Sequence, residues 1–175
     1  MTAEVVRIYS PKYFGLPAER HGEYVIGVEK LPNMQDDITK LFEQHWEETE
    51  TKYLDEPLRP DWDMLHFMSE QNRLLIFTAR TAEGEMVGDI MYQLGHHAHM
   101  SGMLVSKEDN FFCLKAHRGS GLARALLDYA IRYHTHLGVK YMGMSDKSPV
   151  GGKSLEPFLE SFGFRPNAIH YMKKL

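Results

Sequence analysis

One short stretch decides how this chain folds: Arg118-Gly119-Ser120-Gly121-Leu122-Ala123. It follows an apolar run at residues 111–114, which predicts a buried strand. After it, apolar residues recur every three or four positions as far as Leu137, which predicts a helix. The stretch is therefore expected to be a strand-to-helix turn, and the unpaired N–H groups of such a helix start favour a phosphate.

Two common phosphate-binding loops do not fit this stretch. The Walker loop requires Gly-Lys followed by Ser or Thr, and no such sequence follows here. The dinucleotide-binding fingerprint requires a third glycine at the position that Arg124 occupies. A different kind of phosphate loop is therefore needed.

The pattern Arg-x-x-Gly-x-Gly/Ala, with Arg118, Gly121 and Ala123 at its fixed positions, resembles the signature loop of the GNAT superfamily of N-acetyltransferases. The resemblance runs from residue 109 to the end of the chain and includes Phe162-Gly163-Phe164. The stretches 96–99 and 144–147 also resemble GNAT-like proteins of bacteriophages and bacteria.

This resemblance implies an α/β (α+β) fold with a mixed, mostly antiparallel central sheet, helices on both faces and a parallel strand pair that splays apart. It also implies acetyl-CoA as the cosubstrate, with its pyrophosphate on the loop and its pantetheine arm along the splayed strand. The residues expected to bind it are Phe112, Cys113, Leu114, Arg118, Gly119, Ser120, Gly121, Leu122, Ala123 and Arg124.

Periodicity along the chain predicts elements in the same order. The expected strands are 24–28, 74–79, 86–94, 109–114 and 140–144, and the expected helices are 37–51, 61–70 and 122–137. A further helix and a last strand complete the order that the resemblance implies. Residues 1–20 show no clean periodicity and are interpreted as an extension, so that 21–175 form a single acyl-CoA-binding domain.

Composition narrows the class of protein. The net charge of −4 argues against a nucleic-acid partner, because such proteins carry a basic surface. The sequence contains no apolar run of membrane-spanning length and does not start like a targeting segment, so a soluble, cytoplasmic protein is expected. Cys113 is the only cysteine, which rules out an intrachain disulfide. A homodimer is left open.

N-acetyl transfer requires removal of a proton from the attacking amine. Glu108 and Asp109 stand at the start of the predicted strand and point to opposite faces, and Asp109 is favoured as the base. His97 and His99 are the next candidates, because the pKa of histidine lies near neutrality. No metal ion is expected to bind to His96, His97 and His99.

The proton donor to the leaving thiolate is harder to place. Many GNAT enzymes carry a tyrosine at the position that Leu159 occupies here. The expected substitutes are Tyr171, Tyr141, Ser145 or solvent. His134 and His136, near the end of the long helix, are interpreted as surface residues.

Acidic residues exceed basic ones between Glu43 and Asp63. In GNAT folds this region forms one wall of the acceptor site, which suggests a cationic acceptor: a polyamine, an aminoglycoside-like amine, or a lysine or N-terminus of a protein. A solvated acidic helix face explains the same charges equally well. Two other functions stay open, a non-catalytic acyl-CoA-binding regulator and a protein-interaction factor with a vestigial loop.

Overall fold

The computed structural model describes residues 16–52, 54–147, 154–170 and 172–174. These residues form two compact units, which meet in sequence at Ser145 and Asp146. The division into an extension, 1–20, and one domain, 21–175, stays a prediction, although strand β1 (Glu19–His21) spans its boundary.

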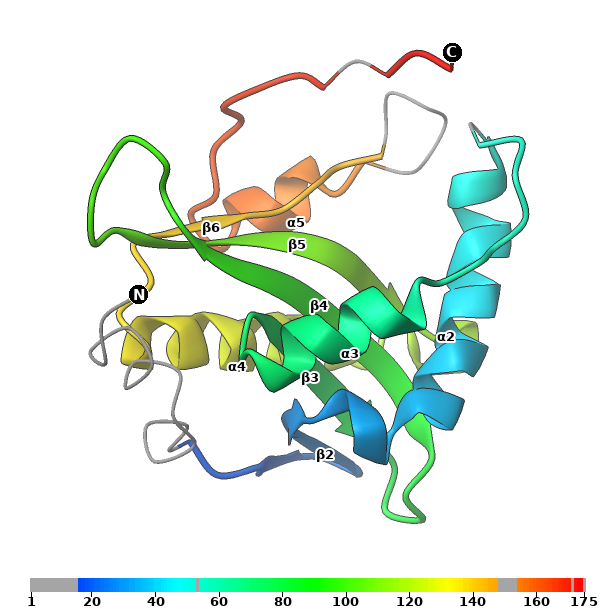
Figure 1. The fold of residues 1–175 in the computed structure, drawn as a ribbon. Helices are drawn as coiled ribbons and strands as arrows, with labels where there is room; N and C mark the ends of the chain where they lie inside the picture. Colours follow the sequence, from blue (N-terminus) through cyan, green and yellow to red (C-terminus); the bar gives the residue numbers. More distant parts are fainter. Residues whose placement is uncertain (1–15, 53, 148–153, 171, 175) are drawn as a thin grey trace. The chain divides into compact units, whose positions relative to one another are not determined.

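The first unit is built on a six-stranded sheet whose strands follow chain order (Figure 1). Its strands after β1 are β2 (Tyr24–Glu29), β3 (Leu74–Arg80), β4 (Met86–His96), β5 (Leu104–Cys113) and β6 (Tyr141–Gly143). All neighbouring strands are antiparallel except β5 and β6, which are parallel. The predicted mixed, mostly antiparallel sheet with one parallel pair is therefore confirmed.

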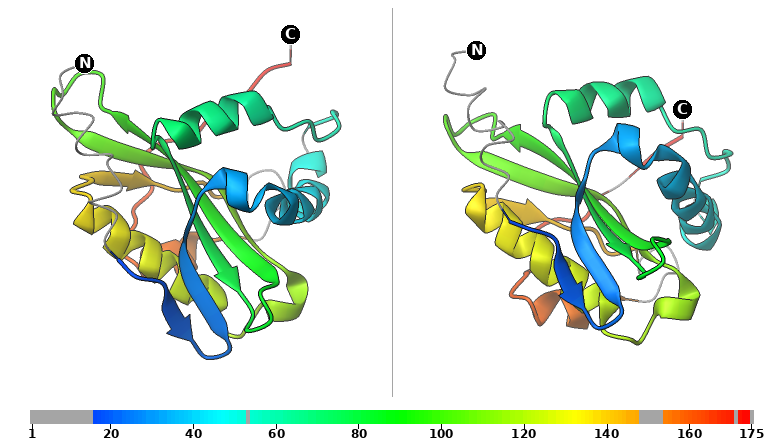
Figure 2. Two further views of the ribbon diagram at one scale, coloured as in Figure 1. Left: turned by 60° about the horizontal axis from the view of Figure 1, so that its bottom comes forward. Right: turned by 90° about the horizontal axis from the view of Figure 1, so that it is seen from below.

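Helices lie on both faces of this sheet (Figure 2). Helices α2 (Gln35–Glu48) and α3 (Trp62–Glu70) cover one face, and α4 (Leu122–His136) covers the other. Within the described residues, short 3-10 helices connect the elements: η2 (Leu31–Asn33), η3 (Glu50–Lys52) and η4 (Lys115–His117). The second unit contains α5 (Glu156–Glu160). The α2 and α3 side chains close one apolar core with residues of β3, β4 and β5.

Helix α3 has well-defined caps that fix the position of the next strand. The Asp61 carboxylate accepts from the N–H of Met64 at 2.9 Å and caps the start of the helix. At its end Asn72 adopts φ 52°, and the N–H of Arg73 donates to the Met68 carbonyl at 2.8 Å. This Schellman-type ending turns the chain directly into β3 and places Arg73 beside the last turn of α3.

Two predicted strand boundaries are wrong, and one predicted strand does not form in the described residues. β5 begins at Leu104, not at residue 109, and β4 continues to His96, because the two strands remain paired to His96 and Leu104. The run Val105-Ser106-Lys107-Glu108 is mostly polar, so the apolar pattern used to predict strands does not extend over it. The predicted last strand is absent from residues 164–170 and 172–174.

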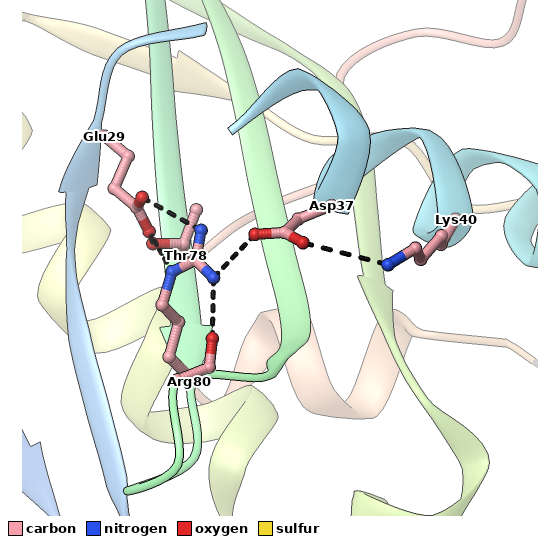
Figure 3. Close-up of polar contacts among 6 residues, drawn as sticks. Glu29, Asp37, Lys40, Thr78 and Arg80 are labelled. Atoms are coloured by element: carbon pink, nitrogen blue, oxygen red, sulfur yellow. Dashed lines mark hydrogen bonds and ion pairs between the residues drawn. The ribbon is translucent and has the colours of Figure 1, made fainter. Parts of the chain in front are cut away.

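An ion-pair cluster joins the sheet to the start of α2 (Figure 3). The Arg80 guanidinium donates to Glu29 Oε1 at 2.7 Å and to Asp37 Oδ2 at 2.8 Å. The same guanidinium donates to the Gly84 carbonyl in the β3–β4 turn, and Thr78 donates to Glu29. One half-buried arginine therefore links β2, the β3–β4 hairpin and α2.

Asp89 and His134 are buried, and neither forms an ion pair within the described residues. Asp89 on β4 is fully buried, and burial raises the pKa of its carboxyl to about 7. Its Oδ2 accepts from Asn110 Nδ2, whereas its Oδ1 has no partner. His134 on α4 is 1% exposed, and burial lowers the pKa of its imidazole to about 4. The predicted surface position of His134 is wrong, because His134 lies one and two turns after Ala130 and Leu127 on the buried face of α4.

We predict that Arg80→Met lowers the free energy of unfolding by about 2 kcal/mol, because it leaves the half-buried Glu29 carboxylate without its partner. The matched control is Arg132→Met, since Arg132 also pairs with two carboxylates but on an exposed surface. The control is expected to lose less than about 1 kcal/mol. Urea unfolding measures both, and equal losses would contradict the prediction.

We predict that the stability of Asp89→Asn relative to the wild type increases with pH. The folded-state pKa of Asp89 is raised, so as the pH rises to about 7 the carboxyl ionises in the unfolded chain but stays protonated in the folded one. This difference lowers the stability of the wild type, whereas asparagine does not titrate. The advantage of the variant should grow by about 3 kcal/mol between pH 5 and pH 8. Urea unfolding of both proteins at the two pH values measures this difference, and His134 cancels because both proteins contain it. An advantage that is the same at both pH values would show that Asp89 does not titrate in this range.

Candidate functional site

The loop before α4 presents backbone N–H groups to an open space. Gly119 and Gly121 have φ of 83° and 87°, which other residues rarely adopt. A Cβ built on Gly119 meets no atom within 4 Å. Helix α4 starts at Leu122 without a side-chain cap, and the first N–H groups of a helix have no intrahelical partner. This geometry suits an anion such as the pyrophosphate of acetyl-CoA.

Arg118 holds this loop to the rest of the unit. Its Nε donates to the Cys113 carbonyl at 2.7 Å, and its Nη1 lies 2.9 Å from Glu48 Oε2. The guanidinium also lies over the Phe112 ring, 5.1 Å from its centre. Arg118 therefore connects the end of β5 to α2.

Ser120 shapes the turn from within. Its hydroxyl donates to the His117 carbonyl at 2.7 Å, and its Oγ accepts from the N–H of Leu122 at 3.3 Å. Two residues that the sequence analysis missed also lie here. His21 Nε2 is 3.6 Å from the Cβ position of Gly121, and Tyr24 Oη is hydrogen-bonded to His117 Nδ1 at 3.0 Å. No local pattern marks them, since sheet pairing brings them from the first two strands.

One edge of β5 opens next to this loop. β6 pairs only with residues Val105–Lys107 of β5. The N–H of Leu114 donates to the Val87 carbonyl, so the alternation of the strand turns the N–H of Cys113 toward the edge that β6 leaves. Of the three backbone donors expected for pantetheine, that of Leu114 is therefore already engaged.

A β-bulge marks the place where β5 and β6 separate. Met91 pairs with Asn110 and Tyr92 with Glu108, so Asp109 has no opposite residue on β4. Asp109 is exposed, and its Oδ1 accepts from Gln93 Nε2 at 3.0 Å. Glu108 Oε2 accepts from the N–H of Ser145, beyond the end of β6, at 3.1 Å. The two candidate bases thus have different neighbours: Asp109 contacts β4, and Glu108 contacts the segment that follows β6.

The two histidines proposed as alternative bases lie far from Asp109. His97 and His99 are exposed in the β4–β5 turn, where the N–H of His99 donates to His97 Nδ1. The base of this turn lies roughly 16 Å along β5 from Asp109, at about 3.3 Å per residue. Tyr171 lies outside the described residues. Leu159, which belongs to the second unit, is a buried residue.

Two buried titratable groups lie on the strands beside the loop, Cys113 on β5 and Asp89 on β4. Burial raises the pKa of the Cys113 thiol to about 12, so this thiol stays neutral and is not a nucleophile. Asp89, which pairs across the ladder with Phe112, is the acidic residue that sequence analysis missed. Its only sequence signal is a charge inside a strand of apolar residues. No group of three or more potential metal ligands occurs in the described ranges.

An open pocket of about 240 Å³ lies on the other side of Asp109 from the loop. It is lined by Met68, Arg73, Gln93, Leu94, Gly95, Val105, Ser106 and Lys107. Gln93 joins this pocket to Asp109 through their hydrogen bond. The β5 strand therefore has the phosphate-type loop at one end and a pocket at the other, with Asp109 between them.

Part of the acidic excess on the first two helices is neutralised within the fold. Glu48 pairs with Arg118 and Lys115, and Asp37 pairs with Arg80. Asp61 serves as a helix cap. These contacts reduce the negative charge that remains for an acceptor. Across the described part of the chain, no helix is both long enough and apolar enough to cross a membrane.

Solved structures with this fold include several acetyltransferases. One is a ribosomal-protein-alanine N-acetyltransferase from Brucella melitensis biovar Abortus, with 17% identity, a TM-score of 0.64 and coverage of 87% of this chain and 99% of that chain. Another is an aminoglycoside acetyltransferase from an uncultured soil metagenomic sample, with 16% identity, a TM-score of 0.66 and coverage of 90% and 99%. An acetyltransferase from Trypanosoma brucei has 18% identity, a TM-score of 0.64 and coverage of 87% and 99%. At these identities the likeness shows the fold.

A search of curated protein sequences finds no match. The family described as "Acetyltransferase (GNAT) family" matches residues 36–164, which include α2, the whole β3–β5 meander, the loop and α4. The chain therefore belongs to the GNAT family of acetyltransferases.

Proposed function

We propose that this protein transfers the acetyl group of acetyl-CoA to a primary amine by direct attack of the amine on the thioester. The observation that carries the proposal is the arrangement along β5. The loop Arg118–Ala123 stands at one end, the edge left by β6 runs beside it, and Asp109 stands where the edge begins. This arrangement lets a CoA thioester and an amine meet at the bulge from opposite ends of the strand.

In this proposal the N–H groups of Gly119, Ser120, Gly121, Ala123 and Arg124 bind the pyrophosphate, while that of Leu122 donates to Ser120 Oγ. The N–H of Cys113 faces the pantetheine arm. Leu122 and Ala123 form the first turn of α4, and Ser120 keeps the turn in shape. Phe112 supports the loop through its contact with the Arg118 guanidinium. These residues act mainly by positioning the thioester.

Asp109 is proposed to accept the proton of the attacking amine, directly or through water. It is exposed to solvent at the bulge, where a β-strand often redirects a side chain. His97 and His99 are less suitable, because the turn that holds them is remote from the bulge. Solvent or Tyr171 would protonate the thiolate, since Leu159 cannot.

The sequence supports a charge for the acceptor amine but not its identity. The acidic stretch between Glu43 and Asp63 supports an acceptor with a positive charge, such as a small cationic amine or a lysine or N-terminus of a protein. A cytoplasmic location stays a prediction, as does the absence of a metal. An acyl-CoA-binding regulator without turnover is the alternative, and it would bind acetyl-CoA without releasing CoA to any amine.

We predict that Gly121→Glu abolishes acetyl-CoA binding, because a carboxylate would stand where the pyrophosphate is expected. Isothermal titration calorimetry with acetyl-CoA measures the change. Gly138→Glu is the matched control, since Gly138 follows the same helix with φ 76° and open space around its Cβ position. Both substitutions strain the backbone by about 1–3 kcal/mol, but only Gly121→Glu should lose affinity. Unchanged affinity of Gly121→Glu would remove the loop from the site.

We predict that Asp109→Asn lowers kcat at least about 100-fold, as expected for loss of a general base, and leaves the Kd for acetyl-CoA unchanged. CoA release by chromatography measures the rate with a panel of amines. Glu108→Gln is the comparison, because Glu108 is the adjacent carboxylate and its Oε2 accepts from the Ser145 N–H. A large loss in Glu108→Gln with a normal rate in Asp109→Asn would reverse the assignment.

A further inference from the structure

The pocket beyond Asp109 carries two cations of its own. Arg73 and Lys107 both line it, and both are exposed. Neither has a carboxylate within 4.0 Å in the part of the chain that the structure describes. Arg73 Nε donates only weakly, at 3.5 Å, to the Leu94 carbonyl, which leaves the other nitrogens of its fork available. Two such cations in one pocket are suited to a carboxylate.

The fold sets both cations in place through rigid elements. The Schellman-type ending of α3 fixes the backbone of Arg73 against Met68 and against Leu94, whose N–H donates to the Arg73 carbonyl at 2.8 Å. Lys107 lies on β5 where that strand is paired on both sides, with Gln93 on β4 and Gly143 on β6. Their positions therefore depend on paired backbone and not on a loose loop.

The same pocket reaches the proposed base. Gln93 lines the pocket and donates to Asp109, and Lys107 lies two residues before Asp109, about 6–7 Å along the strand. A small molecule with an amine near Asp109 can therefore place a carboxylate at Lys107 and Arg73. Met68, Leu94 and Val105 supply apolar lining between the polar groups.

We infer that the acceptor is a small amino acid-like molecule whose carboxylate is bound by Arg73 and Lys107 while its amine attacks at Asp109. This inference rests on the proposed function and names the substrate class of that site. It is compatible with the acidic first helices, because the amine of such a molecule is cationic before it loses its proton. It differs from a polyamine or aminoglycoside acceptor, which has no carboxylate for the two cations.

The test uses three acceptors that differ only at the carboxylate: L-leucine, L-leucinamide and 3-methylbutylamine. In the presence of CoA, calorimetry measures their binding to the full-length protein, and CoA release measures their acetylation. We expect leucine to bind at least 10-fold more tightly than the other two. Arg73→Gln and Lys107→Gln should each weaken leucine binding about 10-fold or more, as expected for a lost charged hydrogen bond, without changing the Kd for acetyl-CoA.

Two exposed cations far from the pocket serve as matched controls, Arg20→Gln on β1 and Lys40→Gln on α2, and both should bind leucine normally. Leucinamide or 3-methylbutylamine binding as tightly as leucine would overturn the inference, and so would equal losses for all three acceptors in the two pocket variants. Failure of the proposed function would give a different result: no binding of acetyl-CoA, or no CoA release with any amine. The calorimetric comparison of leucine with its amide does not depend on turnover, so it tests carboxylate recognition by the pocket separately from the proposed function.

Discussion

The hydrogen bonding of β5 is the constraint on which the site depends. This strand is paired with β4 from Leu104 to Cys113, except at Asp109, but with β6 only over Val105–Lys107. A backbone edge without a strand partner must find other donors and acceptors or face solvent. The bulge at Asp109 coincides with the place where pairing on the second side stops. The opening is thus a consequence of where the short β5–β6 ladder ends, and the loop and the pocket lie on its two sides along β5.

The two substrate regions of the site share structural supports. Arg118 belongs to the loop, yet its guanidinium is held by Glu48 on α2 and by the Cys113 carbonyl. His45 of α2 packs on Phe112, with ring centres 5.5 Å apart. Arg80 fixes the other end of α2 to the sheet. Helix α2 is therefore held near its start by Arg80 of the sheet and at its end by Arg118 of the loop before α4.

The sequence was most informative where a local pattern determines the structure. The loop, α4 and the hairpin of β3 and β4 were predicted because glycine positions and apolar periodicity act over a few residues. Asp89, Arg73 and Lys107 carry no such signal. They acquire a role through pairing between distant strands and through the end of α3. The burial of His134 could have been predicted, since it lies seven residues after Leu127 on the apolar face.

The state of Cys113 has a practical consequence for measuring this enzyme. It is the only cysteine of the chain, it is 7% exposed, and its raised pKa keeps the sulfur protonated at neutral pH. Disulfide and maleimide reagents react with accessible thiolates, and the folded protein offers them none. A colour change with such a reagent therefore reports the free thiol of the reaction product, and a signal from the protein itself reports unfolding.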